Sequence, residues 1–353
     1  MVRIDALLSA SERALVIAGN GIRLIGQREQ FLDFINDAAL PFVTTWTGAD
    51  LAPTDHPFNC GIIGMCGQEG ANKAVFAADL ILALGTHLSI PQTSTCRPWA
   101  PQAKKIIVDI DQDQLDNLTV DVDLKVCMDL KDFFAQAVSR IKPRQAVSWL
   151  CPFSKMSRHP NIGSYFLNSE MTKSLPDGTT MVVDGGGTAL YTGFQSSYVK
   201  EGSRLICSSS MSAMGSGLPE AIGACFASGK KLTTCLIGDG SMMFNLQELQ
   251  TIRTHNLPIK IFIINNKGYL AIRKTQAQFQ EGRFYGVGGD DLQFPRFSDV
   301  AKTFNIPYFL STDAALHCEG PAICEWFCDM MQPTLHQKFF NGVAQPLSEM
   351  AFD

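Results

Sequence analysis

Two short motifs separated by one helix-length segment constrain the fold of this chain more than any other feature. Gly238-Asp239-Gly240-Ser241 follows the apolar run 232–237, and Asn265-Asn266 follows the β-branched run 259–264. Such runs are typical of buried parallel strands. Between them, apolar residues recur at helical spacing over residues 245–255. The sequence therefore predicts a β-α-β unit with one motif at the end of each strand.

The two motifs place hard oxygen donors at one edge of the predicted sheet. A right-handed crossover brings the carboxyl ends of successive parallel strands to the same edge, so Asp239 and Asn266 are expected to lie close together. Carboxylate and amide oxygens suit Mg²⁺, which usually completes its coordination with phosphate oxygens of a ligand. Neither histidine nor cysteine belongs to the pair, so zinc is not expected. Each motif alone would also suit a tight turn or a strand cap, but together they predict a magnesium and diphosphate site.

The pair of motifs resembles the signature of thiamine diphosphate enzymes, in which Gly-Asp-Gly is followed by Asn-Asn after some two dozen residues; here 24 residues intervene. Residues 266–273 and 213–223 are similar to the acetohydroxyacid synthase (acetolactate synthase) branch of that family. The resemblance covers the family's central domain and its C-terminal cofactor-binding domain. We expect the N-terminal pyrimidine-binding domain of the family to be missing from this chain.

The resemblance implies a metal site and a diphosphate loop. The side chains of Asp239 and Asn266 and the backbone carbonyl of Gly268 would bind Mg²⁺. Residues 184–188 would lie against the diphosphate, where Gly187-Thr188 stands in place of a Gln-His pair common in acetohydroxyacid synthases. Backbone N–H groups and the Thr188 hydroxyl would then make most of the phosphate contacts. A plain flexible turn is the alternative interpretation of these glycines.

The resemblance also implies contacts to the rings of thiamine diphosphate. Met214 would separate the two rings and hold the cofactor bent, although a methionine also suits a core position. The backbone carbonyl of Ser212 would accept a hydrogen bond from the 4'-amino group. The complete set of implied cofactor-binding residues is Gly187, Thr188, Ser212, Met214, Gly238, Asp239, Gly240, Ser241, Asn266, Gly268, Tyr269 and Leu270.

The implied activity is decarboxylation of a 2-keto acid, with transfer of the remaining fragment to a second carbonyl compound or its release, so the protein would be a transferase or lyase. The cofactor carries this chemistry. Residues 267–276 and 286–289 are predicted to form loops that close over substrate, with Tyr269, Arg273 and Gln276 as polar contacts. The alternative is a solvated loop with Arg273 in a surface ion pair.

No catalytic residue can be assigned. In the family, a glutamate from the pyrimidine-binding domain bonds N1' of the cofactor, and neither Glu69 nor Glu220 stands in a matching context. We therefore expect the isolated chain to be nearly inactive, and to need a separate pyrimidine-domain chain or to derive from a split or truncated gene. A homo- or hetero-oligomer is expected, because the family's active site lies between domains. The alternative is a non-catalytic cofactor-binding or regulatory remnant.

The chain as a whole is predicted to be α/β, with two three-layer α/β/α domains and mainly parallel sheets over residues 1–150 and 151–353. Strands are expected at 14–18, 80–84 and 105–110, alternating with helices at 30–39, 71–78 and 130–140. The boundary is expected near residues 142–160, where prolines cluster and apolar periodicity lapses.

The first domain resembles one that binds FAD in acetohydroxyacid synthases and nothing in many relatives. Gly19-Asn20-Gly21 and residues 64–67 lie where flavin-contacting glycines lie in that family. Gly85-Thr86-His87 replaces a Gly-Ala-Arg motif, and residues 88–92 lack the family's substrate-handling arginine. Binding of FAD therefore stays an alternative that is not favoured. The glycine fingerprint is incomplete, so NAD-dependent chemistry is a more distant alternative.

Composition restricts the partners. A net charge of −5 without a basic run argues against nucleic acid and anionic membrane surfaces. No apolar stretch reaches transmembrane length, and the first residues show no signal peptide. The eleven cysteines are scattered and odd in number, which indicates reduced core residues of a cytoplasmic protein. Cys324 and Cys328 are not expected to form a zinc site.

Overall fold

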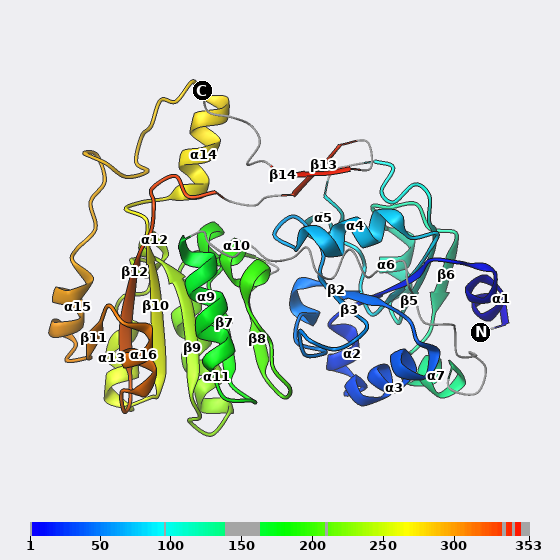
Figure 1. Cartoon of the computed structure of the whole chain (residues 1–353), viewed down its shortest axis with the longest axis horizontal. Helices are drawn as coiled ribbons and strands as arrows, with labels where there is room; N and C mark the ends of the chain where they lie inside the picture. The colour runs from blue at the N-terminus through cyan, green and yellow to red at the C-terminus, as the bar shows by residue number, and fades with distance from the viewer. Residues whose placement is uncertain are drawn as a thin grey trace. The chain divides into compact units, whose positions relative to one another are not determined.

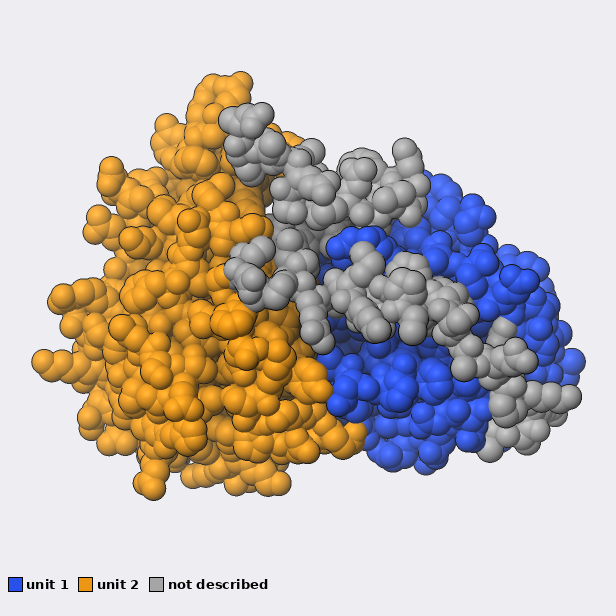
Figure 2. All heavy atoms as spheres, viewed as in Figure 1, with its two compact units in different colours: residues 1–158, 335–353 blue, residues 159–334 orange. Residues whose placement is uncertain are grey.

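The computed structural model describes residues 2–94, 97–137, 163–208, 211–333, 337–340 and 343–346. The chain divides into two compact units, the first formed by residues 1–158 with 335–353 and the second by residues 159–334 (Figure 2). The predicted boundary at 142–160 and the division after residue 150 lie outside the described residues and stay predictions.

The first unit is built on a six-stranded sheet in the order β3-β2-β1-β4-β5-β6, with all neighbours parallel (Figure 1). These strands are β1 (Ala14–Ala18), β2 (Phe42–Thr44), β3 (Asn59–Ile62), β4 (Leu80–Leu84), β5 (Lys104–Asp109) and β6 (Leu124–Cys127). The helices are α1 (Val2–Ala10), α2 (Gly21–Leu24), α3 (Arg28–Ala38), η1 (Trp46–Gly48), α4 (Glu69–Ala77), α5 (Ile90–Thr93), α6 (Gln112–Asp116) and α7 (Leu130–Ala137). An antiparallel hairpin of β13 (Gln337–Phe340) and β14 (Val343–Pro346) completes the unit.

Helices cover both faces of this sheet because its strands are apolar on both sides. Val16 and Leu82 belong to a core cluster with the phenylalanines of α3 and α7. Their neighbours along the strands, Leu15 and Ile81, pack instead with the alanines of α4. Successive strand residues point to opposite faces, so two separate cores form a three-layer arrangement.

The second unit contains another six-stranded parallel sheet, in the order β11-β12-β10-β9-β7-β8 (Figure 1). Its strands are β7 (Thr180–Val183), β8 (Arg204–Ile206), β9 (Thr233–Gly238), β10 (Ile259–Asn265), β11 (Tyr308–Phe309) and β12 (Ala322–Phe327). Its helices are α9 (Gly163–Ser174), α10 (Gly187–Ser196), α11 (Gly217–Ala227), α12 (Asp239–Met242), α13 (Glu248–Thr254), α14 (Leu270–Phe279), α15 (Phe297–Thr303) and α16 (Thr312–His317).

The strand order of the second unit reverses between β7 and β9. Side chains of β9 and β10, such as Ile237 and Ile261, pack against α11, α13 and α15 on one face, while α10 contacts β7 and β9. Gly193 permits that close approach, since a Cβ there would lie 2.7 Å from the methyl carbons of Val183. The connections after β7 and β9 thus leave toward opposite faces, and ligands of open α/β sheets bind at such reversal points.

The structure confirms the predicted fold class of two α/β units with parallel sheets. Strands β1 and β4 have the predicted bounds, and β5 differs from its prediction by one residue at each end. The predicted β-α-β unit is present as β9, α13 and β10, with the short helix α12 added after β9. Among the described helices, none is long and apolar enough to cross a membrane.

Candidate functional site

An open cavity in the second unit lies at the carboxyl ends of β7, β9 and β10. Ten of the twelve predicted cofactor-binding residues line it: Gly187, Thr188, Met214, Gly238, Asp239, Gly240, Ser241, Gly268, Tyr269 and Leu270. Gly186, Ala189, Ala271 and Ile272 also line it. Gly186 belongs to the segment predicted to lie against the diphosphate, and Ala271 and Ile272 belong to the predicted substrate loop, so Ala189 is the one that lies outside the predicted segments. Ser212 and Asn266 do not line the cavity, but the Asn266 side chain contacts Thr188, which does, and Ser212 lies two residues before Met214.

Asp239 is the buried carboxylate of this cavity, with 1% of its surface exposed. Its Oδ1 accepts a hydrogen bond from the Gly240 N–H at 2.7 Å, and its Oδ2 accepts one from the Gly268 N–H at 3.1 Å. Burial raises the pKa of Asp239 to about 6, and the backbone donors act in the opposite direction. A bound cation would favour the charged carboxylate in this position.

Asn266 lies beside Asp239, whose charged form its backbone N–H stabilises, and its side chain carries a second oxygen. Its side chain is 1% exposed, and its Nδ2 donates to the Thr188 hydroxyl at 3.3 Å. Its Oδ1 is buried and has no hydrogen-bond partner among the described residues. Buried polar oxygens are rarely left without a partner, so this atom points to a ligand. The two side chains therefore fit a magnesium ion, with the orphaned amide oxygen as the observation that supports it.

The turn after β10 has a backbone conformation that requires glycine at position 268. The Lys267 N–H donates to the Asn265 side-chain oxygen at 3.1 Å, and Lys267 has a positive φ of 57°. At Gly268 φ is 145°, and a Cβ would lie 2.0 Å from the Val287 carbonyl oxygen. This turn places the Gly268 N–H on Asp239 and brings Asn266 beside it.

The segment that holds Met214 packs directly on the glycine-rich loop after β7. Ser212 has a positive φ of 47°. A Cβ at Gly185 would lie 2.5 Å from the carbonyl carbon of Ser212 and from the carbonyl oxygen of Ala213. Backbone therefore lies against backbone here, and Met214 reaches the cavity wall.

The N-terminus of α10 also faces the cavity, through Gly186, Gly187 and Thr188. Helix N-termini present free backbone N–H groups and a positive dipole end, which suit a diphosphate. In the described part of the chain, no group of three His, Cys, Asp or Glu side chains could hold a metal. The donor set is thus one carboxylate, one amide and backbone groups, which suits magnesium with phosphate oxygens and does not suit zinc.

The prediction of a loop over residues 267–276 is wrong from Leu270 onward, because α14 spans Leu270–Phe279. Leu270, Arg273 and Gln276 recur every three residues and are all buried, which is the pattern of a helix face against a core. The apolar pattern of the sequence did not indicate this buried face, because two of its three residues are polar.

Arg273 and Gln276 bind protein backbone, so the structure does not support their predicted role as substrate contacts. Arg273 is 4% exposed and donates to the carbonyls of Met330, Lys267 and Val287. Gln276 exchanges two hydrogen bonds of 3.0 Å with the backbone of Tyr285. The alternative of a surface ion pair for Arg273 is also wrong. Both side chains brace the segment that includes residues 286–289, while Tyr269 lines the cavity.

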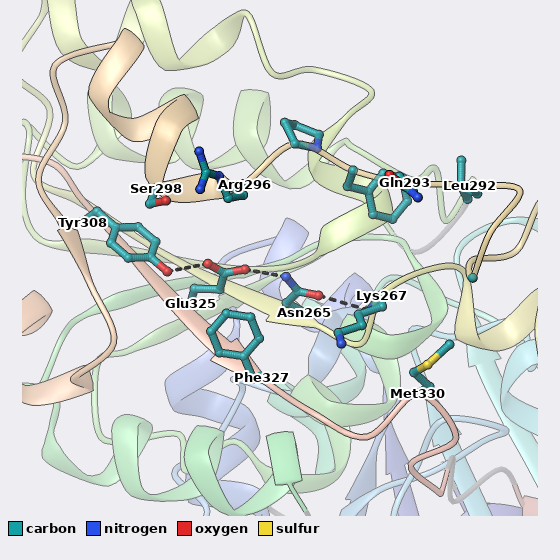
Figure 3. Close-up of a pocket in the computed structure, with 13 residues that line it drawn as sticks. Asn265, Lys267, Leu292, Gln293, Arg296, Ser298, Tyr308, Glu325, Phe327 and Met330 are labelled. Carbon is teal, nitrogen blue, oxygen red and sulfur yellow. Dashed lines mark hydrogen bonds between the residues drawn. The ribbon is translucent and has the colours of Figure 1, made fainter.

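A second cavity, of about 420 Å³, lies at the ends of β10 and β12 and was not predicted. Glu325 on its wall accepts hydrogen bonds from the Tyr308 hydroxyl and from the Asn265 amide, as Figure 3 shows. Burial and this carboxylate raise the pKa of Tyr308. The Asn265 side chain then accepts from the Lys267 N–H, so this network braces the turn that carries Asn266.

Comparison with known families and proteins agrees with this geometry. The model for the central domain of thiamine pyrophosphate enzymes matches residues 3–137. The model for their C-terminal thiamine pyrophosphate-binding domain matches residues 185–325, which include the cavity. Together the two models cover well over half of the chain. The chain belongs to the thiamine pyrophosphate enzyme family.

Several acetolactate synthases are similar to this family member along most of its length. Acetolactate synthase 2, chloroplastic, of Zea mays is 28% identical over 319 residues, or 85% of this chain and 50% of that protein. The acetolactate synthase large subunit of Lactococcus lactis is 29% identical over 311 residues, or 85% and 53%. The isozyme 1 large subunit of Escherichia coli is 26% identical over 287 residues, or 78% and 50%. The chain thus spans about half the length of these curated relatives.

Proposed function

We propose that this chain is the diphosphate-binding component of a thiamine diphosphate- and Mg²⁺-dependent enzyme that decarboxylates a 2-keto acid and transfers or releases the fragment, as an acetolactate synthase-like transferase or lyase. The main supporting observation is the buried Asn266 Oδ1, which has no hydrogen-bond partner among the described residues. The Asn266 side chain contacts Thr188 at the edge of a cavity that Asp239 and nine other predicted cofactor-binding residues line. The similarity to acetolactate synthases supports the substrate class.

The residues of this chain would bind and orient the cofactor. Asp239, Asn266 and the Gly268 carbonyl would hold the magnesium ion, and the N-terminus of α10 with Thr188 would hold the diphosphate. Met214 would support the bent cofactor, and the Ser212 carbonyl would accept from its amino group. Thiamine diphosphate, when bound, supplies the carbanion chemistry that lets carbon dioxide leave a 2-keto acid.

The proposed catalytic acid or base comes from outside this chain. Among the described residues that line the cavity, Asp239 is the one carboxylate, and it faces the metal position. We infer that a separate pyrimidine-binding chain contributes the glutamate, so that the active enzyme is a homo- or hetero-oligomer and the isolated chain turns over very slowly. The described cysteines are free, which supports a cytoplasmic compartment.

Affinity purification of the tagged full chain from its native host tests this function. We expect a co-purifying protein with a pyrimidine-binding domain, and turnover of a 2-keto acid such as pyruvate that depends on thiamine diphosphate and Mg²⁺. Asp239→Ala should abolish turnover, whereas the exposed-residue control Asp177→Ala should retain it. Full activity of the isolated chain would refute the need for a partner. Cofactor binding without turnover in any complex would favour the non-catalytic alternative.

A further inference from the structure

Asp184 is a fully buried carboxylate that the sequence predicts only as part of the diphosphate loop, with no role of its own. It follows β7, its side chain is 0% exposed, and it does not line the cavity. We propose that Asp184 is the positioning residue that holds three cofactor-binding segments together, an inference that rests on the proposed function of the same site. The three segments are residues 184–188, residues 212–217 and residues 239–241.

The hydrogen bonds of Asp184 reach every one of these segments. Its Oδ1 accepts from the Gly186 N–H at 2.8 Å, within the diphosphate loop. Its Oδ2 accepts from the Gly217 N–H at 3.0 Å, at the start of α11. It is also hydrogen-bonded to the Gly215 backbone and to the Ser241 side chain. One side chain thus joins the ends of β7 and β9 with the segment that carries Met214.

Glycines allow the three segments to approach this carboxylate closely. A Cβ at Gly186 would lie 2.3 Å from the Ser241 Oγ, and a Cβ at Gly217 would lie 3.0 Å from the Asp184 Cβ. The segments therefore meet around Asp184 with no room for other side chains. A small displacement of any of them would move Met214, Gly187 or Ser241 within the cavity that they line.

The chemistry of the donors requires a carboxylate. All of these contacts present an N–H or O–H group to Asp184, and an ionised carboxylate accepts at both oxygens. An asparagine has nearly the same shape, but its NH₂ group would face donors on one side. Asp184→Asn therefore removes acceptor capacity without leaving a void. Its effect reports on the hydrogen bonds that position the segments and not on lost packing.

The test compares Asp184→Asn with Lys260→Met in the full chain. Lys260 is also buried in the second unit, where its ammonium donates to the backbone carbonyls of Cys318 and Gly320, outside the three segments. Calorimetry with thiamine diphosphate and Mg²⁺ should show affinity about 10- to 100-fold weaker in Asp184→Asn. Lys260→Met should lower the melting temperature without changing that affinity.

Hydrogen exchange of the cofactor-free protein gives a readout that does not depend on the proposed function. Amides of residues 186, 215 and 217 should lose about tenfold or more of their protection in Asp184→Asn, while those of β10 should keep theirs. Lys260→Met should leave the three segments protected. Unchanged protection in Asp184→Asn would overturn the proposal, whereas lost protection in a protein that binds no cofactor would overturn the proposed function alone.

Ser241→Ala keeps the test decisive if Asp184→Asn does not fold. This variant removes one of the donors to Asp184 and adds nothing to the crowded region. We expect a smaller loss of protection, confined to residues 184–188 and 239–241. Unchanged protection in these residues would count against the proposed role of Asp184.

Discussion

The two units of the chain have the same layered architecture, but they differ at the point where the strand order reverses. In the first unit this point lies between β1 and β4. Here the Gly19 N–H donates to the Leu84 carbonyl at 2.9 Å, and the Gly21 N–H donates to the Gly85 carbonyl at 3.1 Å. A Cβ at Gly19 would lie 2.2 Å from the Gly85 oxygen. The two connections therefore close directly on each other.

In the second unit the corresponding connections, after β7 and β9, meet around the Asp184 side chain, together with the segment of Met214. A cavity opens beside them at Asp239. The Asn266 oxygen next to it has no partner among the described residues. The two units thus differ at the reversal point of the same fold, and we propose that the residues at this point let the second unit bind a diphosphate and its metal.

The buried carboxylates of the two units show the same difference. Asp50 in the first unit is 3% exposed and binds the Arg23 guanidinium, so its charge is balanced within the protein. Asp239 in the second unit is bound by backbone N–H groups and faces a cavity. A carboxylate in the second setting can bind a cation, whereas one in the first setting stabilises the fold.

The largest expected effect is that of Asp50→Ala on the stability of the first unit. Removal of this carboxylate leaves a largely buried guanidinium without its salt bridge, so we expect a loss of about 3 kcal/mol in the free energy of unfolding. Urea denaturation measures this loss, with the exposed-residue variant Asp37→Ala as a control of nearly unchanged stability. Affinity for thiamine diphosphate should stay unchanged, and a drop in that affinity would contradict the division of roles between the units.

Cysteine alkylation measures the opening of each unit separately in one sample. Cys60 in the first unit and Cys235 in the second are buried, and burial raises the pKa of Cys60 to about 12. Each should therefore react only when its own unit opens, whereas the exposed Cys127 reacts at once. Thiamine diphosphate, added with Mg²⁺ at 100 times its dissociation constant, should slow the alkylation of Cys235 by about 100-fold.

Mass spectrometry of the alkylated peptides reads all three rates, and Cys127 serves as the internal control for reagent. Because the cofactor site lies in the second unit, we expect the cofactor to leave the alkylation rate of Cys60 unchanged. Equal slowing of Cys60 and Cys235 would mean that the units open together, and would contradict their separate roles.

A smaller effect is expected for Gly240→Ala in the cavity. The added methyl group would lie 2.2 Å from the ring of Tyr269, so the ring must move and affinity for thiamine diphosphate should fall about tenfold. Gly223→Ala is the matched control, because a Cβ at that position in α11 meets no atom within 4 Å. Calorimetry should show unchanged affinity for the control, whose stability should rise by up to about 1 kcal/mol. Equal affinity of the two variants would contradict the placement of Tyr269.

The sequence predicted the position of site residues correctly where a motif directly follows an apolar run. Apolar runs that stop at Gly238 and Asn265 place the ends of β9 and β10, and parallel strands bring such ends to one edge. The motif residues therefore come together as expected.

Long-range contacts explain what sequence reasoning missed. Arg273 is buried because carbonyls at positions 287 and 330 surround its guanidinium, and nothing near it in the sequence indicates this. Asp184 was predicted only as part of a loop, although its partners Gly217 and Ser241 lie far along the chain. A buried aspartate after a strand and before three glycines is the one local signal that could have drawn attention to it.

Calorimetric titration of thiamine diphosphate into the purified chain, with Mg²⁺ and with EDTA, is the direct test of a magnesium and diphosphate site in the second unit. We expect one binding site per chain that requires Mg²⁺, that is lost in Asp239→Ala, and that is retained in Asp177→Ala. No binding by the wild-type chain, or equal binding with EDTA or in Asp239→Ala, would contradict a magnesium and diphosphate site built on Asp239 and Asn266.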